Sequence, residues 1–384
     1  MSQSPTLWHK LYHGETSFDF VGRWKLWFTI SGIVILIGLI SLFTRGLNFG
    51  IDFEGGNAWE VKAPSLSVAK ARDALRPLGL AEAKIQRLGS DTVRVQADIT
   101  GSEAKQNEKR DAVAAALAKA GKVSASQVSV NTVGPTWGGE VTRKAVRALI
   151  FFFAAITLYI TLRFEWKMAI AALVAVIHDI LVTVGVYSLS GFEVTPATVI
   201  AFLTILGYSM YDTIVVFDKV EENTKGLAAS GRLTYGDTVN LSMNQVLMRS
   251  INTSLVAILP ILSVLLVGAY LLGATTLEEF GLALLIGLLT GAYSSIFIAS
   301  PLLAMLKERE PRYATIKQRI LARGAGTGPL TPAAAAAGGI TVSVAAAVEG
   351  DGDGAARSSG PARTPPRPGG NRPPPRPRKK GKKR

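Results

Sequence analysis

Four ionisable residues stand in stretches of the chain that are otherwise apolar. Asp212 lies inside the run Thr198–Val220, Arg249 lies in a later apolar block, and His178 and Asp179 are adjacent in an earlier one. A carboxylate at the centre of a membrane helix costs roughly 2.5–3.5 kcal/mol on insertion scales. We expect such groups to have partners and to face protein or water rather than lipid. The pattern indicates a membrane transport machine.

Arg249 shares one helix face with other polar residues. Gln245, Asn252 and Thr253 lie three or four residues from it or from one another, which places them on one stripe. An arginine near a helix end can also simply snorkel to lipid headgroups. Snorkelling requires no Asn and Thr a turn deeper, so the stripe favours a functional face.

Asp212 and Arg249 can form a titratable pair. Asp212 precedes Asp218 by six residues, about 9 Å along a helix axis, and this places both residues of the pair in the cytoplasmic half of the membrane. A carboxylate whose counter-charge approaches and departs can take up and release a proton. A static structural ion pair is the alternative.

His178 and Asp179 fall near the middle of the third apolar segment. Adjacent residues project about 100° apart on a helix, so we do not expect them to face one another. A proton relay and a packing role through hydrogen bonds to neighbouring helices both stay open. In the last segment, Gly287, Gly291 and Ser295 recur every four residues, a ladder typical of close helix packing rather than chemistry.

Six apolar segments must position these residues. Each is about 20 residues long, the length that crosses a bilayer core. The first, residues 24–43, is too long for a signal peptide and no A-x-A site follows it, so we expect an uncleaved membrane helix. The others lie within residues 144–306, at Lys144–Leu162, Met168–Ser190, Pro196–Phe217, Val246–Leu272 and Phe280–Leu306.

Residues 45–142, between the first and second segments, are soluble in character. Strands are expected at Asn57–Lys62, at Ala83–Leu88, around Val93–Val95 and around Val128–Val130, because apolar residues alternate or cluster there. Helical spacing after the first and third strands completes the order β-α-β-β-α-β, a ferredoxin-like unit. The predicted fold is an α-helical polytopic membrane protein with six transmembrane helices and one extracytoplasmic ferredoxin-like α+β domain.

The distribution of Lys and Arg predicts the orientation. The short loop Arg163–Lys167, the stretch 219–249 and the segment 307–320 carry basic residues, whereas the loops Gly191–Thr195 and Gly273–Glu279 carry none. By the positive-inside rule, residues 1–23 and the C-terminus are cytoplasmic and the soluble domain lies outside.

Composition separates a tail from the rest of the chain. The 384 residues are 48% hydrophobic and carry a net charge of +14, but eleven Lys and Arg lie between Arg357 and Arg384, which leaves about +3 elsewhere. Residues 321–384 are rich in Ala, Gly, Pro and Arg, and we expect them to be disordered and cytoplasmic. The tail either binds anionic lipid or ribosomal RNA or is solvated with no fixed partner.

The sequence lacks the motifs that mark several classes of enzyme and metal-binding protein. The chain has no cysteine and three histidines, which argues against disulfides and dense metal sites. The glycines of Phe49–Gly56 have no following Lys-Ser/Thr and no helix is expected to begin there, so a phosphate loop is rejected. No Walker motif, zincin motif or nucleophile elbow occurs. We therefore expect neither an enzyme nor a bound cofactor.

Five segments together resemble the SecF family of the bacterial Sec translocase. They are NFGIDFEGG (48–56), HDILVTVG (178–185), LTILGYSMYDTIVVF (203–217), SMNQVLMRSINTSL (242–255) and GAYSSIFIASPL (291–302). The resemblance implies half of a resistance-nodulation-division (RND) fold, completed by a homologous SecD-like subunit. It also implies use of the proton gradient to promote late steps of protein export across the bacterial cytoplasmic (inner) membrane. The implied partners are the SecYEG channel, YajC- or YidC-like proteins and unfolded preproteins.

The resemblance also assigns roles to two residues. Asp212 matches the functional carboxylate of the fourth span and Arg249 the functional arginine of the fifth, the same residues that the polar pattern selects. One departure is Tyr211, where the family usually has Asn. The alternatives are a lipid or drug exporter of the same superfamily and a scaffold. Exporters usually have about twelve spans and two large loops, and a scaffold has no use for Asp212 and Arg249.

Overall fold

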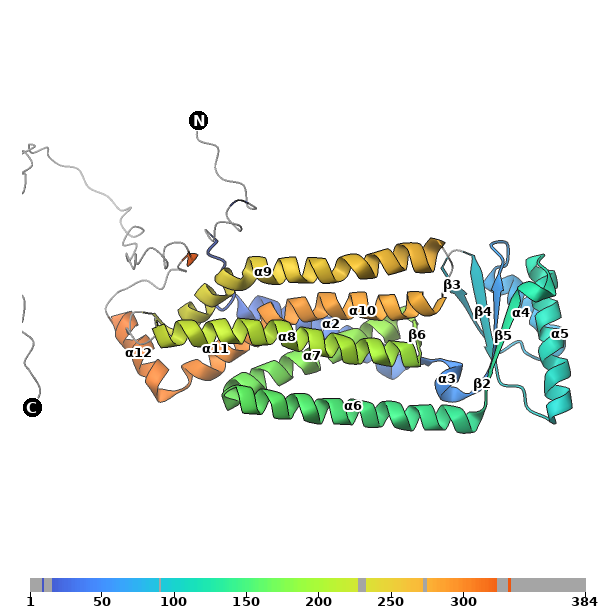
Figure 1. Ribbon diagram of the computed structural model, residues 1–384, viewed down its shortest axis with the longest axis horizontal. Helices are drawn as coiled ribbons and strands as arrows, with labels where there is room; N and C mark the ends of the chain where they lie inside the picture. The colour runs from blue at the N-terminus through green and yellow to red at the C-terminus, as the bar shows by residue number, and fades with distance from the viewer. Residues whose placement is uncertain are drawn as a thin grey trace, which may run out of the picture. The chain divides into compact units, whose positions relative to one another are not determined.

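Six long apolar helices and a four-stranded sheet make up most of the part of the chain that the structure describes (Figure 1). The structure is a computed structural model, and it describes residue 9 and residues 16–89, 91–226, 233–271, 275–322 and 331–332. The six expected membrane helices are confirmed. They are α2 (Trp24–Arg45), α6 (Pro135–Arg163), α7 (Trp166–Ser190), α8 (Pro196–Gly226), α9 (Tyr235–Ser263) and α10 (Thr275–Ser294).

Helices α8 and α9 are longer than the apolar segments from which they were predicted. Hydropathy predicted a basic stretch at residues 219–249 between two spans, but α8 continues to Gly226 and α9 already begins at Tyr235. Thr234 and Asp237 form a capping box at the start of α9, which satisfies backbone donors that have no partner in the helix. Apolar content marks only the part of a helix inside the bilayer, so it misses these polar turns.

Two helices change to π-helical geometry near their ends. α9 continues into η4 (Val264–Leu271), and α10 continues through η5 (Ser295–Ala299) into α11 (Ser300–Glu308). A further helix, α12 (Pro311–Ala322), covers most of the expected basic segment 307–320 and includes the first two residues of the expected tail. Apart from residues 321, 322, 331 and 332, that tail lies outside the described residues.

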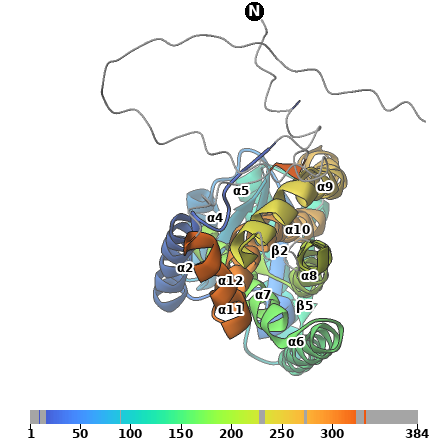
Figure 2. The ribbon, with the colours of Figure 1, turned by 90° about the vertical axis from the view of Figure 1, so that its left-hand side faces the viewer.

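Helices α7, α8 and α10 form the inside of the bundle. About half of the residues in the most apolar 18-residue stretch of each are buried, against 17% for α2, 6% for α6 and 11% for α9. The end-on view shows α2 and α6 at the periphery (Figure 2). α2 crosses α7 at Gly38 and Gly185, where a Cβ on either glycine would lie 2.7–2.8 Å from the Cα of the other.

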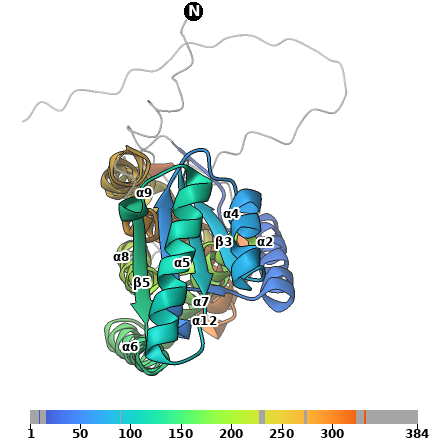
Figure 3. The same cartoon turned by 90° about the vertical axis from the view of Figure 1, so that its right-hand side faces the viewer.

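The soluble domain has the expected order of elements. The sheet is antiparallel in the order β3-β4-β2-β5, which together with its two helices is the ferredoxin-like arrangement. Trp59, Val61, Val93, Val95 and Leu117 are fully buried between the sheet and its helices, and Figure 3 shows α4 and α5 lying over this face. The elements are β2 (Gly56–Lys62), α4 (Val68–Leu75), β3 (Lys84–Leu88), β4 (Thr92–Ala97), α5 (Glu103–Gly121) and β5 (Val128–Val133).

A short pair of strands lies where α2 leads into the domain. β1 (Asn48–Phe49) pairs in parallel with β6 (Glu193–Val194), and the four-residue helix α3 (Ile51–Glu54) follows β1. The expectation that no helix begins in this segment was therefore wrong, because one helical turn closes between two glycines and is too short to show a periodicity. Gly55 and Gly56 then adopt φ angles of 81° and 112°, which L side chains rarely adopt.

Candidate functional site

Asp212 is buried near the middle of α8. Ser250 on α9 donates to both of its carboxylate oxygens, at 2.9 Å to Oδ1 and 2.8 Å to Oδ2. Both side chains are buried. A hydroxyl donor at this depth stabilises a charged carboxylate that would otherwise be unpaired in a medium of low dielectric constant.

Arg249 adjoins Ser250 but faces the other way. Its side chain is exposed in the isolated chain, and among the described residues it forms no direct ion pair with Asp212, so its charge acts on Asp212 only through space. Arg249 is level with the middle of α8, because Ser250 contacts Asp212 there. An exposed guanidinium at this depth would meet lipid unless another protein surface covers α9.

The stripe around Arg249 does not converge on Asp212. Asn252 is exposed, and Gln245 and Thr253 are half-buried. Gln245 accepts a hydrogen bond from Asn223 of α8 at 2.7 Å, and the hydroxyl of Thr253 donates to the carbonyl oxygen of Arg249 at 2.7 Å. The stripe therefore presents Arg249 and Asn252 on the outer side of α9.

His178 and Asp179 contact one another, contrary to the expectation from helix geometry. His178 Nδ1 lies 3.1 Å from Asp179 Oδ1. The 100° angle separates Cβ directions, whereas the proximal ring nitrogen and a carboxylate reach back across that angle. Asp179 Oδ2 also accepts hydrogen bonds from Ser209 of α8 at 2.6 Å and Ser294 of α10 at 2.9 Å. Asp179 thus joins three helices at the centre of the bundle.

The hydrogen-bond network continues from His178 to α2. His178 Nε2 lies 3.0 Å from Ser31 Oγ, and Ser31 donates to the Tyr293 hydroxyl at 3.3 Å. Tyr293 donates to the carbonyl oxygen of Trp27 at 3.2 Å. Buried polar groups with several partners each are held in fixed positions. Ser209, Ser294, Ser31 and Tyr293 were missed in the sequence, because single hydroxyls in an apolar helix do not stand out.

The small-residue ladder of the last span faces α8. A Cβ on Gly287 would meet the side chain of Ile205, and one on Gly291 would meet Ser209 at 2.8 Å. Ser295 donates to the carbonyl oxygen of Ser209 and its hydroxyl lies 2.9 Å from that of Thr213. The ladder therefore lies between the Asp179 network and the residue that follows Asp212.

Two consecutive serines at the start of the π-helical turn η5 contact different helices. Ser294 is the last residue of α10 and bonds Asp179 of α7, whereas Ser295 opens η5 and bonds α8. The hydroxyl of Ser300, which follows η5, donates to the carbonyl oxygen of Ser295. π turns inside α-helices are frequent at functional sites.

This chemistry suits proton transfer and charge storage. The described residues contain no group of three or more His, Asp or Glu that could hold a metal ion. The polar groups that meet in the bundle are carboxylates, an imidazole and hydroxyls, all of which can accept or donate protons.

The family model "Protein export membrane protein SecD/SecF, C-terminal" matches residues 112–309, about half of the chain. A second model, "SecD/SecF GG Motif", matches residues 40–57. The protein translocase subunit SecF of Streptomyces coelicolor is 44% identical over 339 residues, which are 87% of this chain and 90% of the relative. The chain belongs to the SecF family of protein translocase subunits.

A second SecF relative and a solved structure support the same family assignment. SecF of Mycobacterium tuberculosis is 45% identical over 82% of this chain and 72% of the relative. The crystal structure of SecDF from Thermus thermophilus matches with a TM-score of 0.67 and 35% identity over 77% of this chain. The match spans only 39% of that SecDF chain, so this chain corresponds to about two fifths of the solved protein.

The region matched by the SecD/SecF family model includes the candidate site residues on helices α7 to α10. Asp179, Asp212, Arg249 and the ladder all fall within residues 112–309, and Gly55 and Gly56 fall in the matched GG motif. Tyr211, which precedes Asp212 in the chain, is 52% exposed. Its ring therefore lies away from the buried contact between Asp212 and Ser250.

Proposed function

We propose that this SecF-family chain is an accessory subunit of the Sec preprotein translocase that uses the proton gradient to promote late steps of export. Asp212 carries the proposal. It is a buried carboxylate in the middle of a membrane helix, held by one hydroxyl and acted on by the charge of Arg249. In this proposal Asp212 binds and releases the proton, Arg249 modulates its charge, and the His178–Asp179 network is part of the same pathway.

A homologous SecD-like subunit is the proposed partner. The exposed Arg249 and Asn252 on α9 support this, because a guanidinium on the apolar part of a membrane helix is costly against lipid and is stabilised against protein. The match to only two fifths of a SecDF chain supports it as well. SecYEG, YajC- or YidC-like proteins and unfolded preproteins are proposed as the wider assembly, and the basic tail as a contact to anionic lipid or the ribosome.

The proposed location is the bacterial cytoplasmic membrane, with both termini cytoplasmic and the ferredoxin-like domain outside. The distribution of Lys and Arg among the short loops supports this orientation.

Replacing the titrating group tests the proposal. Asp212→Asn keeps the size and a hydrogen-bond acceptor for Ser250 but cannot exchange a proton. We expect it to abolish export that depends on the proton gradient in inverted vesicles, while the protein remains inserted at the wild-type level. Normal gradient-dependent export by Asp212→Asn would refute the assignment.

A double variant separates proton transfer from a static ion pair. Arg249→Met is expected to impair export, and Asp212→Asn/Arg249→Met to be little worse than either single variant, because residues that act as a unit are not additive. Recovery of export in the double variant would instead show that the two residues only balance each other's charge.

A further inference from the structure

The ferredoxin-like domain contacts the bundle through the polar face of its sheet. Helices α4 and α5 cover one face, and side chains of β3 and β4 on the other face reach residues at the end of the bundle. Lys84 Nζ donates to the carbonyl oxygen of Phe49 at 2.9 Å, and Gln86 Nε2 donates to that of Gly191 at 3.3 Å. Polar contacts of this kind are re-hydrated when two bodies separate, as in transient interfaces.

Arg94 of β4 is at the centre of these contacts. Its guanidinium bonds Glu193 of β6 at 2.6 Å and Glu279 of α10 at 2.5 Å, and it also bonds Glu60 of β2 at 2.6 Å. The side chains of Arg94, Glu193 and Glu279 are only 9%, 3% and 9% exposed. Gln96 adds a hydrogen bond to Glu193 at 2.6 Å. One cation of the domain thus bridges two carboxylates that belong to the bundle.

Negative charge exceeds positive charge in this cluster. Three carboxylates share one guanidinium, and Asp52 and Glu278 lie close enough to interact with it as well. The lysines of the same sheet face contact other groups. Lys84 bonds the carbonyl oxygen of Phe49 and Lys62 pairs with Asp91, and neither lysine is among the charges that shift the pKa of Asp52 or Glu278.

The surplus of negative charge shifts the pKa of groups that lie outside the membrane helices. Burial and then the charge of Glu193 raise the pKa of Asp52, and the attraction of Arg94 does not offset them. Burial acts to lower the pKa of Arg94, but the charges of Glu279, Glu193 and Glu60 outweigh it and raise that pKa. Buried charges without a partner are costly.

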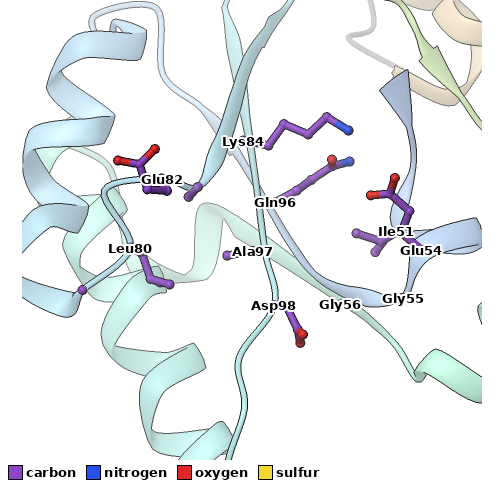
Figure 4. Close-up of a pocket in the computed structure, with 12 residues that line it drawn as sticks. Ile51, Glu54, Gly55, Gly56, Leu80, Glu82, Lys84, Gln96, Ala97 and Asp98 are labelled. Atoms are coloured by element: carbon purple, nitrogen blue, oxygen red, sulfur yellow. The ribbon is translucent and has the colours of Figure 1, made fainter. Parts of the chain in front are cut away.

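Glycines flank the domain where the chain enters it. Gly55 and Gly56 connect α3 to β2 with left-handed φ angles, and a Cβ on Gly134, between β5 and α6, would meet nothing within 4 Å. A pocket of about 410 Å³ opens beside Gly55 and Gly56, between α3 and the edge of the sheet (Figure 4). The domain can therefore tilt about these two connections without first breaking a packed core.

We infer that Arg94, Glu193 and Glu279 form a proton-dependent clamp that docks the ferredoxin-like domain on the membrane bundle. With all carboxylates ionised, docking buries a net negative charge, so the docked state binds protons more tightly than the undocked state. Docking is then strongest at low pH and weakens as pH rises through the range where the buried carboxylates ionise. Linkage requires this sign.

Distance measurements between two spin labels test the clamp. The chain has no native cysteine, so cysteines at Ser126 on the domain and Ser190 at the end of α7, both exposed, label single sites in the full chain in liposomes. We expect one narrow distance population at pH 5 and a second, broader one at pH 8. The ratio of docked to undocked protein should fall by about tenfold for each unit by which one pKa differs between the states.

Variants of the cluster complete the test. Glu279→Gln removes a charge but keeps an oxygen for Arg94, so it should keep the domain docked at pH 8. Glu193→Gln should do the same, and it serves as the second variant. Asp91→Asn alters the pair with the exposed Lys62 on the same domain, away from Arg94, and should leave the pH response unchanged. Identical distance distributions of the wild type at pH 5 and pH 8 would overturn the inference, as would an unchanged pH response in both Gln variants.

Discussion

At the scale of single residues, serine hydroxyls hold the buried carboxylates. Ser209 and Ser294 each donate to Asp179, and Ser250 donates to both oxygens of Asp212. A serine adds little volume to a helix interface and offers one donor, so it can stabilise a carboxylate without separating the helices. The position of each acidic group therefore depends on a neighbouring helix as well as on its own.

Removing the hydroxyl of Ser250 tests this dependence. A hydrogen bond to a charged group contributes about 1.5–3 kcal/mol, so Ser250→Ala should slow gradient-dependent export by about tenfold or more. Ser250→Thr keeps a hydroxyl and should retain most of the activity. The measurement is export into inverted vesicles at fixed proton gradient.

A matched control for Ser250 is available on the same helix. Ser263 is exposed, and its hydroxyl donates to the carbonyl oxygen of Leu259 on its own helix. Ser263→Ala should leave export unchanged. Equal export by Ser250→Ala and Ser263→Ala would show that the bond to Asp212 is dispensable.

At the scale of helices, a crossing between two glycines sets the position of α2 relative to the network. Gly38 and Gly185 bring α2 against α7 with backbone in contact, and the next polar contact, Ser41 to Ser188 at 2.9 Å, lies one turn away. Ser31 and His178 are bonded across the same pair of helices. The distance between α2 and α7 therefore determines whether the network reaches α2.

An added methyl group at this crossing should force the helices apart. In Gly185→Ala the new Cβ would lie 2.8 Å from the Cα of Gly38, and overpacking of this kind costs about 1–3 kcal/mol. We expect a lower thermal unfolding temperature in detergent. Gly32→Ala on α2 is the matched control, because its Cβ would meet nothing within 4 Å. A midpoint for Gly185→Ala equal to that of Gly32→Ala would contradict the role of the crossing.

Local patterns predicted the elements well, and pairwise geometry could not be predicted from them. Hydropathy located six membrane helices, and alternation located the four strands, because both signals repeat along the chain. The polar ends of α8 and α9 were missed because they lie beyond the apolar part. Asp212 was selected because an acid in an apolar run is costly, but the choice of Ser250 rather than Arg249 as its direct partner depends on how two helices rotate against each other.

The cluster around Arg94 shows the same limit across a longer distance. Arg94 and Glu279 are 185 residues apart in the chain. Neither residue has an unusual local setting, since Arg94 alternates with Val93 and Val95 in a strand and Glu279 lies near the start of a helix. Only the pairing of the strands and the docking of the sheet bring them together.

At the scale of the whole described molecule, ion pairs lie at both ends of the bundle, but the ratio of cations to carboxylates differs between the two ends. At the end opposite the sheet, Lys307 pairs with Glu165 and Glu310, and Lys167 pairs with Glu310 at 3.0 Å. Burial acts to raise the pKa of Glu310, but the two lysines outweigh it and lower that pKa. Two cations meet two carboxylates here, whereas Arg94 alone meets three.

The proposed orientation of these two ends can be tested by labelling single introduced cysteines. α8 begins next to β6, whose Glu193 contacts the domain through Arg94, and it ends at Gly226, about 46 Å away at the rise of an α-helix. That length exceeds the bilayer core of about 30 Å, so the two ends of α8 lie on opposite sides of the membrane.

Ser102 on the domain and Glu222 near the end of α8 are both exposed. Because basic loops favour the cytoplasm, a membrane-impermeant maleimide should label Ser102→Cys in intact spheroplasts and Glu222→Cys only after permeabilisation. The cysteine-free parent chain supplies the background. Labelling of Glu222→Cys in intact cells, with protection of Ser102→Cys, would reverse the topology and place the Arg94 clamp on the cytoplasmic side, away from the acidic face of the gradient.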